Sequence, residues 1–145
     1  MAEFINNPTV CVALIPMMGD ALLIIRRGNP NEIGYGEWAL PGGFQEGKLK
    51  ENMKTTVERE VREELGIDVR VKRLFDGDTD EYGHNVLFFE MELTGSAQEI
   101  KPDSNEVMEF AITAQPVMSC FPLHTKAMQD WFKQQDAKRV LFGGM

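Results

Sequence analysis

The chain has 145 residues, of which 43% are hydrophobic and 26% charged, and its formal net charge at pH 7 is -8. This length suits one globular domain with a core of its own, which we expect to span residues 1–145. The negative charge argues against a nucleic acid or an anionic membrane as the main partner. It is compatible with a small anionic substrate, because a bound divalent cation can reverse the sign of the local charge.

The cysteines and the chain start bear on the cellular compartment. Cys11 and Cys120 lie far apart in apolar surroundings, which favours buried, reduced thiols over the alternative of a disulfide. No apolar run is long enough for a membrane span, and the N-terminus MAEFINNPT lacks the basic start and hydrophobic core of a signal peptide. We therefore expect a cytoplasmic protein with no membrane partner.

In chain order, the first half of the sequence predicts a hairpin, a loop, a short strand and a helix. Residues 9–17 and 21–27 are apolar and β-branched, and the turn between them predicts a β-hairpin. Residues 28–37 are rich in Gly, Pro and Asn, and a short strand at 38–40 is expected to stop at Pro41-Gly42-Gly43. A helix is predicted from about Asn52 to Leu65, with Gly66 as its C-terminal stop.

The second half predicts three more strands and a second helix. Apolar and alternating segments indicate strands at 67–75, 85–93 and 107–113. The segment 122–135 carries apolar residues on one side and predicts a helix. Strands in mixed order around two helices indicate an α/β fold with a mixed sheet flanked by helices.

The stretch EREVREELG, residues 58–66, crowds four glutamates into the predicted first helix. On a helical wheel of about 100° per residue, Glu64 falls inside the apolar arc, Glu60 lies on its edge and Glu63 lies beside Glu60. That arc is formed by Met53, Val57, Val61 and Leu65. A fully solvated charged face would place the glutamates opposite the apolar arc, so this interpretation fits only Glu58 and Arg62.

Carboxylates at these spacings reach one another, and they repel when they are partly desolvated. A positive group must offset that repulsion. The wheel directs Arg59 and Arg62 to another side of the helix, so a hard divalent cation is the better candidate. The spacing therefore favours a metal site, with a solvated helix face as the alternative.

These residues resemble a known family motif. The segment GGFQEGKLKENMKTTVEREVREELGI, residues 42–67, is similar to the Nudix box, from Glu51 through Arg59, Glu60, Glu63 and Glu64 to Gly66 and Ile67 without a gap. Gly43 matches the leading glycine, but seven residues separate it from Glu51 where the motif has five. We expect the loop to absorb this two-residue insertion, because extra loop residues cost little free energy.

The resemblance implies an α/β/α sandwich that hydrolyses a nucleoside diphosphate linked to another group, with Mg²⁺ or Mn²⁺. By position, Glu60 and Glu64 would be the principal metal ligands, Glu63 a further ligand, and Gly43 a ligand through its carbonyl oxygen. Glu51 would pair with Arg59, which holds the loop against the helix. Metal ions can neutralise the phosphoryl oxygens and make a bound water more acidic.

The general base varies in this family between glutamates of the box, such as Glu63, and a glutamate on a downstream loop. Glu106 in SNEVMEF is our candidate for the downstream residue, and Glu109 and Glu99 follow it. An ordinary surface role is the alternative for each of these three.

Substrate contacts are harder to assign. Arg26 and Arg27 could grip phosphates, and Tyr82 lies where dinucleoside polyphosphate hydrolases of the family have a tyrosine. Aromatic residues near the box could stack on a base or belong to the core. These are Tyr35, Trp38 and Phe44. His84 and His124 are isolated and are interpreted as structural.

These residues leave three alternative functions, each with a small nucleotide as the substrate or ligand. The first is a diphosphatase acting on ADP-ribose or a related nucleotide sugar or dinucleotide. The second is a house-cleaning nucleoside-triphosphate pyrophosphatase, and the third is a Nudix-fold sensor that binds a nucleotide without cleaving it. The intact set of carboxylates argues against the sensor. Family members are often dimers, so a homodimer is an expectation by analogy alone.

Overall fold

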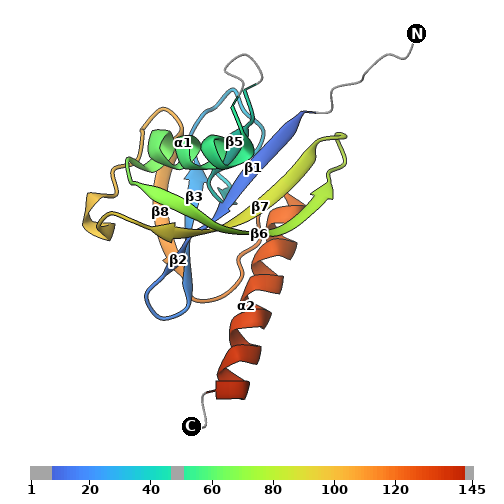
Figure 1. Cartoon of the computed structure of the whole chain (residues 1–145). Coiled ribbons are helices and arrows are strands. Elements are labelled where there is room, and N and C mark those ends of the chain that lie inside the picture. Colours follow the sequence, from blue (N-terminus) through green and yellow to red (C-terminus); the bar gives the residue numbers. More distant parts are fainter. Residues whose placement is uncertain (1–7, 47–50, 143–145) are drawn as a thin grey trace.

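The computed structural model describes residues 8–46 and 51–142 (Figure 1). The N-terminus that lacks a signal pattern lies largely outside this part, as do residues 47–50 of the loop that carries the insertion. In the described part of the chain, no helix has both the length and the apolar character needed to cross a membrane.

The helices and strands alternate in the mixed order that the sequence predicts. In chain order they are β1 (Thr9–Leu14), β2 (Pro16–Met17), β3 (Ala21–Arg27), β4 (Trp38–Ala39), β5 (Gly42–Phe44), α1 (Met53–Leu65), β6 (Val69–Thr79), β7 (Asn85–Leu93), the 3-10 helix η2 (Ala97–Glu99), β8 (Val107–Thr113) and α2 (Pro122–Phe142).

The strands form two sheets. One has the order β5-β1-β7-β6, in which β1 and β7 run parallel and the other neighbours run antiparallel. The second is built around β3, which pairs with β8 along one edge and with the short strands β2 and β4 along the other. The first sheet is therefore mixed, as expected.

Alternate residues of the central strands face two different helices. In β1, Cys11 and Ala13 pack in a core with Val57 and Val61 of α1, whereas Val12 packs in a second core with α2. The strands β3 and β7 contribute to both cores in the same way. Figure 1 shows α1 and α2 on opposite sides of the sheets. Strands that are buried on both faces have continuous apolar sequences, as these central strands do. The layers of helices on both sides of the sheets confirm the predicted α/β/α sandwich.

Several boundaries differ from the prediction. The expected strand 9–17 is split at Ile15, because Pro16 lacks an amide hydrogen and the chain crosses there from one sheet to the other. Gly42–Phe44 is a strand and not a stop. A Cβ atom on Gly42 would collide with the backbone of β1, so the glycine allows β5 to pair closely with β1. The strand expected at 67–75 runs instead from Val69 to Thr79, in register with β7 across two bulges. Helix α2 continues past Gln135 to Phe142.

The helical wheel of α1 was partly wrong. Met53 is 40% exposed and lies outside the core, whereas Thr56 is buried. Glu58 is half-buried and accepts a hydrogen bond from the Val71 amide at 3.0 Å, so it supports β6 instead of facing solvent. Arg62 is exposed as predicted and pairs with Asp68.

Both cysteines are free thiols, so the alternative of a disulfide between them is wrong. Cys11 is fully buried and Cys120 is half-buried. Burial, reinforced by Glu51 and Glu60, raises the pKa of the Cys11 thiol to about 11.

A buried polar contact fastens α2 to β7. The indole nitrogen of Trp131 donates to Glu90 Oε2 at 2.7 Å, and Arg73 Nε donates to Glu90 Oε1 at 3.1 Å. Burial opposes ionisation of Glu90, but these hydrogen bonds outweigh it and hold the pKa of its carboxyl below the ordinary value. The carboxylate is thus satisfied by two partners in an apolar layer.

Replacing Trp131 with Phe should lower the free energy of unfolding by about 1–3 kcal/mol, because the buried carboxylate loses one donor. Denaturant unfolding measures this loss. Trp38→Phe is the matched control, since among the described residues the Trp38 indole has no hydrogen-bond partner. An equal loss in both variants would contradict a specific role for the Glu90 contact.

Candidate active site

Arg59 of α1 ties the helix to the loop before it. Its Nε lies 2.7 Å from Glu51 Oε2 and its Nη2 lies 3.0 Å from Glu51 Oε1, which makes the pair bidentate. The hydrogen bond from Arg59 is the main reason that the pKa of Glu51 falls to about 2. Gln45 Nε2 also donates to the Glu51 carbonyl at 2.7 Å, so the residues on either side of 47–50 are joined. The ion pair that the resemblance implies is present.

The same guanidinium also holds two of the other box glutamates. Arg59 Nη1 lies 3.1 Å from Glu60 Oε1 and 3.0 Å from Glu63 Oε2. With Glu46, whose Oε1 lies 3.7 Å from Arg59 Nη2, one positive charge thus faces four carboxylates, and it cannot neutralise all of them. The wheel directed Arg59 away from Glu60, and this part of the prediction was wrong because the long side chain bends back.

Glu64 is only 7% exposed, as its position inside the apolar arc predicts. Its Oε1 accepts a hydrogen bond from the Gly42 amide at 2.9 Å. Burial, followed by the charge of Glu60, raises the pKa of Glu64 well above its ordinary value. Burial also raises the pKa of Glu60 to about 6, although Arg59 opposes this. These two carboxylates therefore lack sufficient positive charge nearby.

Gly43 lies directly against the Glu60 carboxyl group. A Cβ atom at this position would come within 3 Å of Glu60 Oε1 and Oε2. A glycine here lets β5 approach α1 closely enough for the backbone to share the space around the two glutamates. Gly43 and Glu60 are thereby brought together as the motif predicts.

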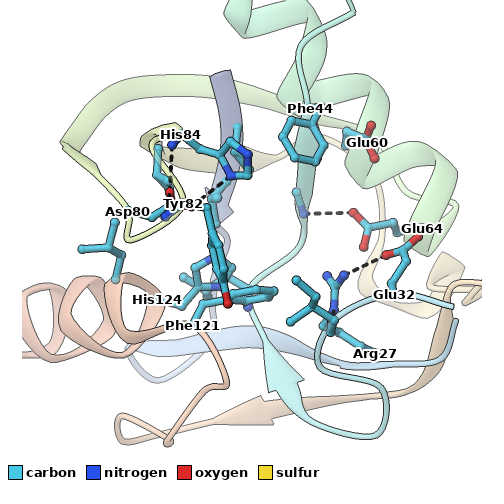
Figure 2. A pocket seen from close by; sticks show the side chains of 18 of the residues that line it. Arg27, Glu32, Phe44, Glu60, Glu64, Asp80, Tyr82, His84, Phe121 and His124 are labelled. Carbon is cyan, nitrogen blue, oxygen red and sulfur yellow. Dashed lines mark hydrogen bonds and ion pairs between the residues drawn. The ribbon is translucent and has the colours of Figure 1, made fainter. Parts of the chain in front are cut away.

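A cavity of about 990 Å³ opens beside these residues. Its acidic end includes Glu32, Glu46, Glu60, Glu63, Glu64, Asp103 and Glu106. Its other part is mainly apolar and aromatic, and is lined by Val10, Val12, Leu40, Phe44, Tyr82, His84, Val86, Phe121, Leu123 and His124, with Thr79, Asp80 and Glu81 beside Tyr82 and His84. Figure 2 shows Glu60 and Glu64 on one side of the cavity and Asp80 and His84 on the other. A ligand with one anionic and one planar part would match this division.

The predicted substrate-binding residues separate into two groups. Arg27 lines the cavity, where its Nη2 pairs with Glu32 at 2.7 Å and its guanidinium lies 5.0 Å from the Phe121 ring centre. Tyr82 lines the cavity too and is 58% exposed. Arg26 does not line it, and instead donates to the Gly36 carbonyl. Geometry thus supports a substrate contact for Arg27 and Tyr82, but not for Arg26.

Of the three downstream glutamates, Glu106 alone lines the cavity, whereas Glu99 and Glu109 do not. Asn29 Nδ2 lies 3.4 Å from Glu106 Oε1 and 3.0 Å from a carboxylate oxygen of Glu32. Burial, then the charge of Glu32, raises the pKa of Glu106 above its ordinary value. The structure brings Glu106 to the acidic end of the cavity.

Some cavity residues were missed or interpreted differently from the sequence. Glu32 and Phe121 were not singled out, because they belong to separate loops that only the fold brings together. Of the aromatic candidates, Phe44 lines the cavity, Trp38 packs beside the core and Tyr35 does neither. His124 accepts the Leu40 amide at Nδ1, and burial lowers its pKa to about 3, as suits a structural side chain.

The acidic end fits a hard divalent cation in its donor set. Glu64 supplies buried and Glu60 half-buried carboxylate oxygens whose charge Arg59 neutralises only in part, and Gly43 supplies backbone beside them. Among residues 8–46 and 51–142, no three potential ligands already converge at coordination distance. The reason is that Glu60 and Glu63 turn toward Arg59 and Glu64 turns toward the Gly42 amide. A cation would therefore have to draw these side chains together.

Comparison with known proteins agrees with this fold and geometry. A family model, the NUDIX domain, matches residues 6–135. An ADP-ribose pyrophosphatase from Methanocaldococcus jannaschii is 31% identical over 133 residues, which cover 88% of this chain and 75% of the relative. The chain belongs to the Nudix family.

Solved structures share the fold at low sequence identity. A NUDIX hydrolase from Nitrosomonas europaea superposes with a TM-score of 0.78 at 17% identity, over 93% of this chain and 75% of that one. An ADP-ribose pyrophosphatase from Streptococcus suis superposes with a TM-score of 0.67 at 22% identity, over 90% of this chain and 92% of that one. The MutT protein from Methanosarcina mazei superposes with a TM-score of 0.70 at 22% identity, over 95% of this chain and 99% of that one.

Family membership settles the general activity. The protein is a Nudix hydrolase that cleaves pyrophosphate bonds, and the enzymes of this family act on small nucleotides and generally use a divalent metal ion. The sensor alternative is thereby set aside.

Gly43→Ala should reduce kcat/KM for pyrophosphate hydrolysis at least tenfold, because the new methyl group displaces the Glu60 carboxylate. The melting temperature should change little, since the displaced atoms are the end of a flexible side chain. Gly95→Ala is the control, because its Cβ would meet only the carboxyl group of Glu99, with Oε2 at 3.0 Å, away from the cavity. Full activity of Gly43→Ala would contradict a close fit between Gly43 and Glu60.

Proposed function

We propose that the protein hydrolyses the diphosphate bond of ADP-ribose or a related nucleotide sugar or dinucleotide, with Mg²⁺ or Mn²⁺. The observation that carries this proposal is the pair of carboxylates formed by half-buried Glu60 and buried Glu64, at one end of a cavity whose other end is mainly aromatic and apolar. The relative that is 31% identical and named an ADP-ribose pyrophosphatase supports the choice of substrate.

Glu60 and Glu64 would hold the metal ion, with Glu63 and the Gly43 carbonyl as further ligands. When bound, the ion supplies positive charge for the phosphoryl oxygens and a more acidic water. Arg59 keeps Glu60 and Glu63 beside the cavity before the ion arrives, and Glu51 fixes Arg59. Glu51 and Arg59 are thus positioning residues for the ligand set.

Arg27 is the cavity's candidate for binding the phosphate groups. One edge of its guanidinium is held by the Ile33 carbonyl at 2.8 Å and by Glu32, and its plane contacts Phe121. These contacts fix the group in place, which reduces the entropy that is lost when it binds an anion.

Glu106 is the candidate general base, with Glu63 as the alternative within the box. The Glu106 carboxylate is held by Asn29 at the acidic end. The raised pKa of Glu106 favours uptake of a proton from an attacking water. The water attacks phosphorus, the bond to the bridging oxygen breaks, and ADP-ribose yields AMP and ribose 5-phosphate.

Glu64→Gln should lower kcat for ADP-ribose by about 100-fold or more, the range for removing one preorganised charged group from an active site. Product formation with and without Mg²⁺ or Mn²⁺ measures this effect. Glu58→Gln is the matched control, because Glu58 lies on the same helix and also accepts a backbone amide, but does not line the cavity.

A substrate panel decides the substrate class. ADP-ribose, a nucleotide sugar and a dinucleotide should be cleaved faster than nucleoside triphosphates. Preferred cleavage of a triphosphate to a monophosphate and inorganic pyrophosphate would instead establish the house-cleaning alternative.

Full turnover by Glu64→Gln would contradict the assignment of Glu64 to the metal site.

A further inference from the structure

A tight turn between β6 and β7 is organised by the side chain of Asp80. Asp80 Oδ1 accepts the backbone amides of Tyr82 at 2.9 Å and of His84 at 2.8 Å. The Asp80 amide donates to the His84 carbonyl at 2.9 Å, and Gly83 provides the positive φ of 82° that closes the turn. One carboxylate therefore fixes the backbone that presents Tyr82 and His84 to the cavity.

The second oxygen of Asp80 sets the orientation of the His84 ring. Asp80 Oδ2 lies 3.1 Å from His84 Nδ1. An ionised carboxylate can only accept hydrogen bonds, so Nδ1 carries a proton, and whenever the ring holds this one proton alone Nε2 is an acceptor. Within the described parts of the chain Nε2 has no hydrogen-bond partner, and His84 lines the cavity. The ring thus offers one acceptor of fixed direction to a ligand.

Aromatic surfaces stand beside this acceptor. The Phe44 ring meets His84 edge to face with centres 5.2 Å apart, and the Tyr82 ring centre lies 6.2 Å from that of His84. Phe44 is 50% exposed and Tyr82 is 58% exposed, so both retain free surface that a planar ligand can cover. Figure 2 shows His84 and Tyr82 across the cavity from Glu64, with Phe44 between His84 and Glu60. Nucleobases stack on such surfaces whatever their identity, so stacking alone gives little specificity.

We propose that His84, held in one tautomer by Asp80, reads the hydrogen-bonding edge of the substrate's nucleobase and thereby sets base specificity. This inference rests on the proposed function, because it assumes a nucleotide whose diphosphate lies at the acidic end. His84 is a specificity-determining residue in this scheme and Asp80 is its positioning residue.

The scheme makes a prediction about the sign of a preference. In Asp80→Asn the side-chain oxygen can still accept the turn amides, but the NH₂ group must donate to Nδ1. The ring proton then moves to Nε2, which changes from acceptor to donor. A 6-amino purine has a donor at position 6 and an acceptor at N1, whereas a 6-oxo purine has the reverse. Whichever of these atoms faces His84, the preference between the two purines must invert.

The test measures the binding of AMP, IMP and ribose 5-phosphate to the Mg²⁺-loaded protein by calorimetry. In the wild type the AMP and IMP dissociation constants should differ by about two- to tenfold, the range of one neutral hydrogen bond. Asp80→Asn should reverse their order, and His84→Phe should abolish the difference while leaving ribose 5-phosphate binding unchanged. Asp78→Asn, an exposed neighbour outside the cavity, should behave as the wild type.

An unchanged order of AMP and IMP in Asp80→Asn, or no difference between them in the wild type, would overturn the proposal. Melting temperatures show whether each variant is folded, and either variant alone suffices for a decision. If the base effect is missing while ADP-ribose is still cleaved, this inference fails and the proposed function stands. If ADP-ribose is not cleaved at all, the proposed function fails independently of the base preference.

Discussion

The arrangement of the site depends on a single guanidinium group. Arg59 contacts Glu51, Glu60 and Glu63 at 2.7 to 3.1 Å, and its Nη2 also lies 3.5 Å from the Phe44 carbonyl in β5. It therefore joins the helix, the loop before it and the strand that carries Gly43. A lysine could not replace it, because one ammonium group lacks the planar set of donors that reaches several carboxylates at once. Arg59 holds the carboxylates close, yet leaves them short of positive charge.

The acidic helix was predictable from the sequence because local periodicity fixes which side chains of one helix share a face. The burial of Glu64 and the pairing of Glu51 with Arg59 followed from the wheel and the motif. The aromatic end was predicted only in part, because Phe44 and Tyr82 were named as candidates, whereas His84 was interpreted as structural and Phe121 was not singled out. Residues so far apart in the chain are brought together only by the fold. The Arg59 side chain was also misplaced, because a helical wheel gives the direction of the Cβ atom but not the position of the guanidinium group at the end of a long side chain.

The strands show the same limit of local reasoning. Two glycines in succession normally indicate a turn, but at Gly42 and Gly43 their missing side chains allow β5 to lie close to β1 and to Glu60. That close approach is tertiary information. It also explains how the site is built: the backbone of β5 meets buried carboxylates on α1 without a side chain between them, which leaves room for a cation.

The central claim is that two incompletely neutralised carboxylates on α1, buried Glu64 and half-buried Glu60, form a cation site. The most direct measurement is the melting temperature of metal-free protein as Mg²⁺ or Mn²⁺ is added. Binding to the folded state alone must raise the melting temperature of the wild type and of Glu58→Gln with increasing metal concentration. Glu64→Gln should show little or no rise. An equal rise in Glu64→Gln and in the wild type would contradict the account.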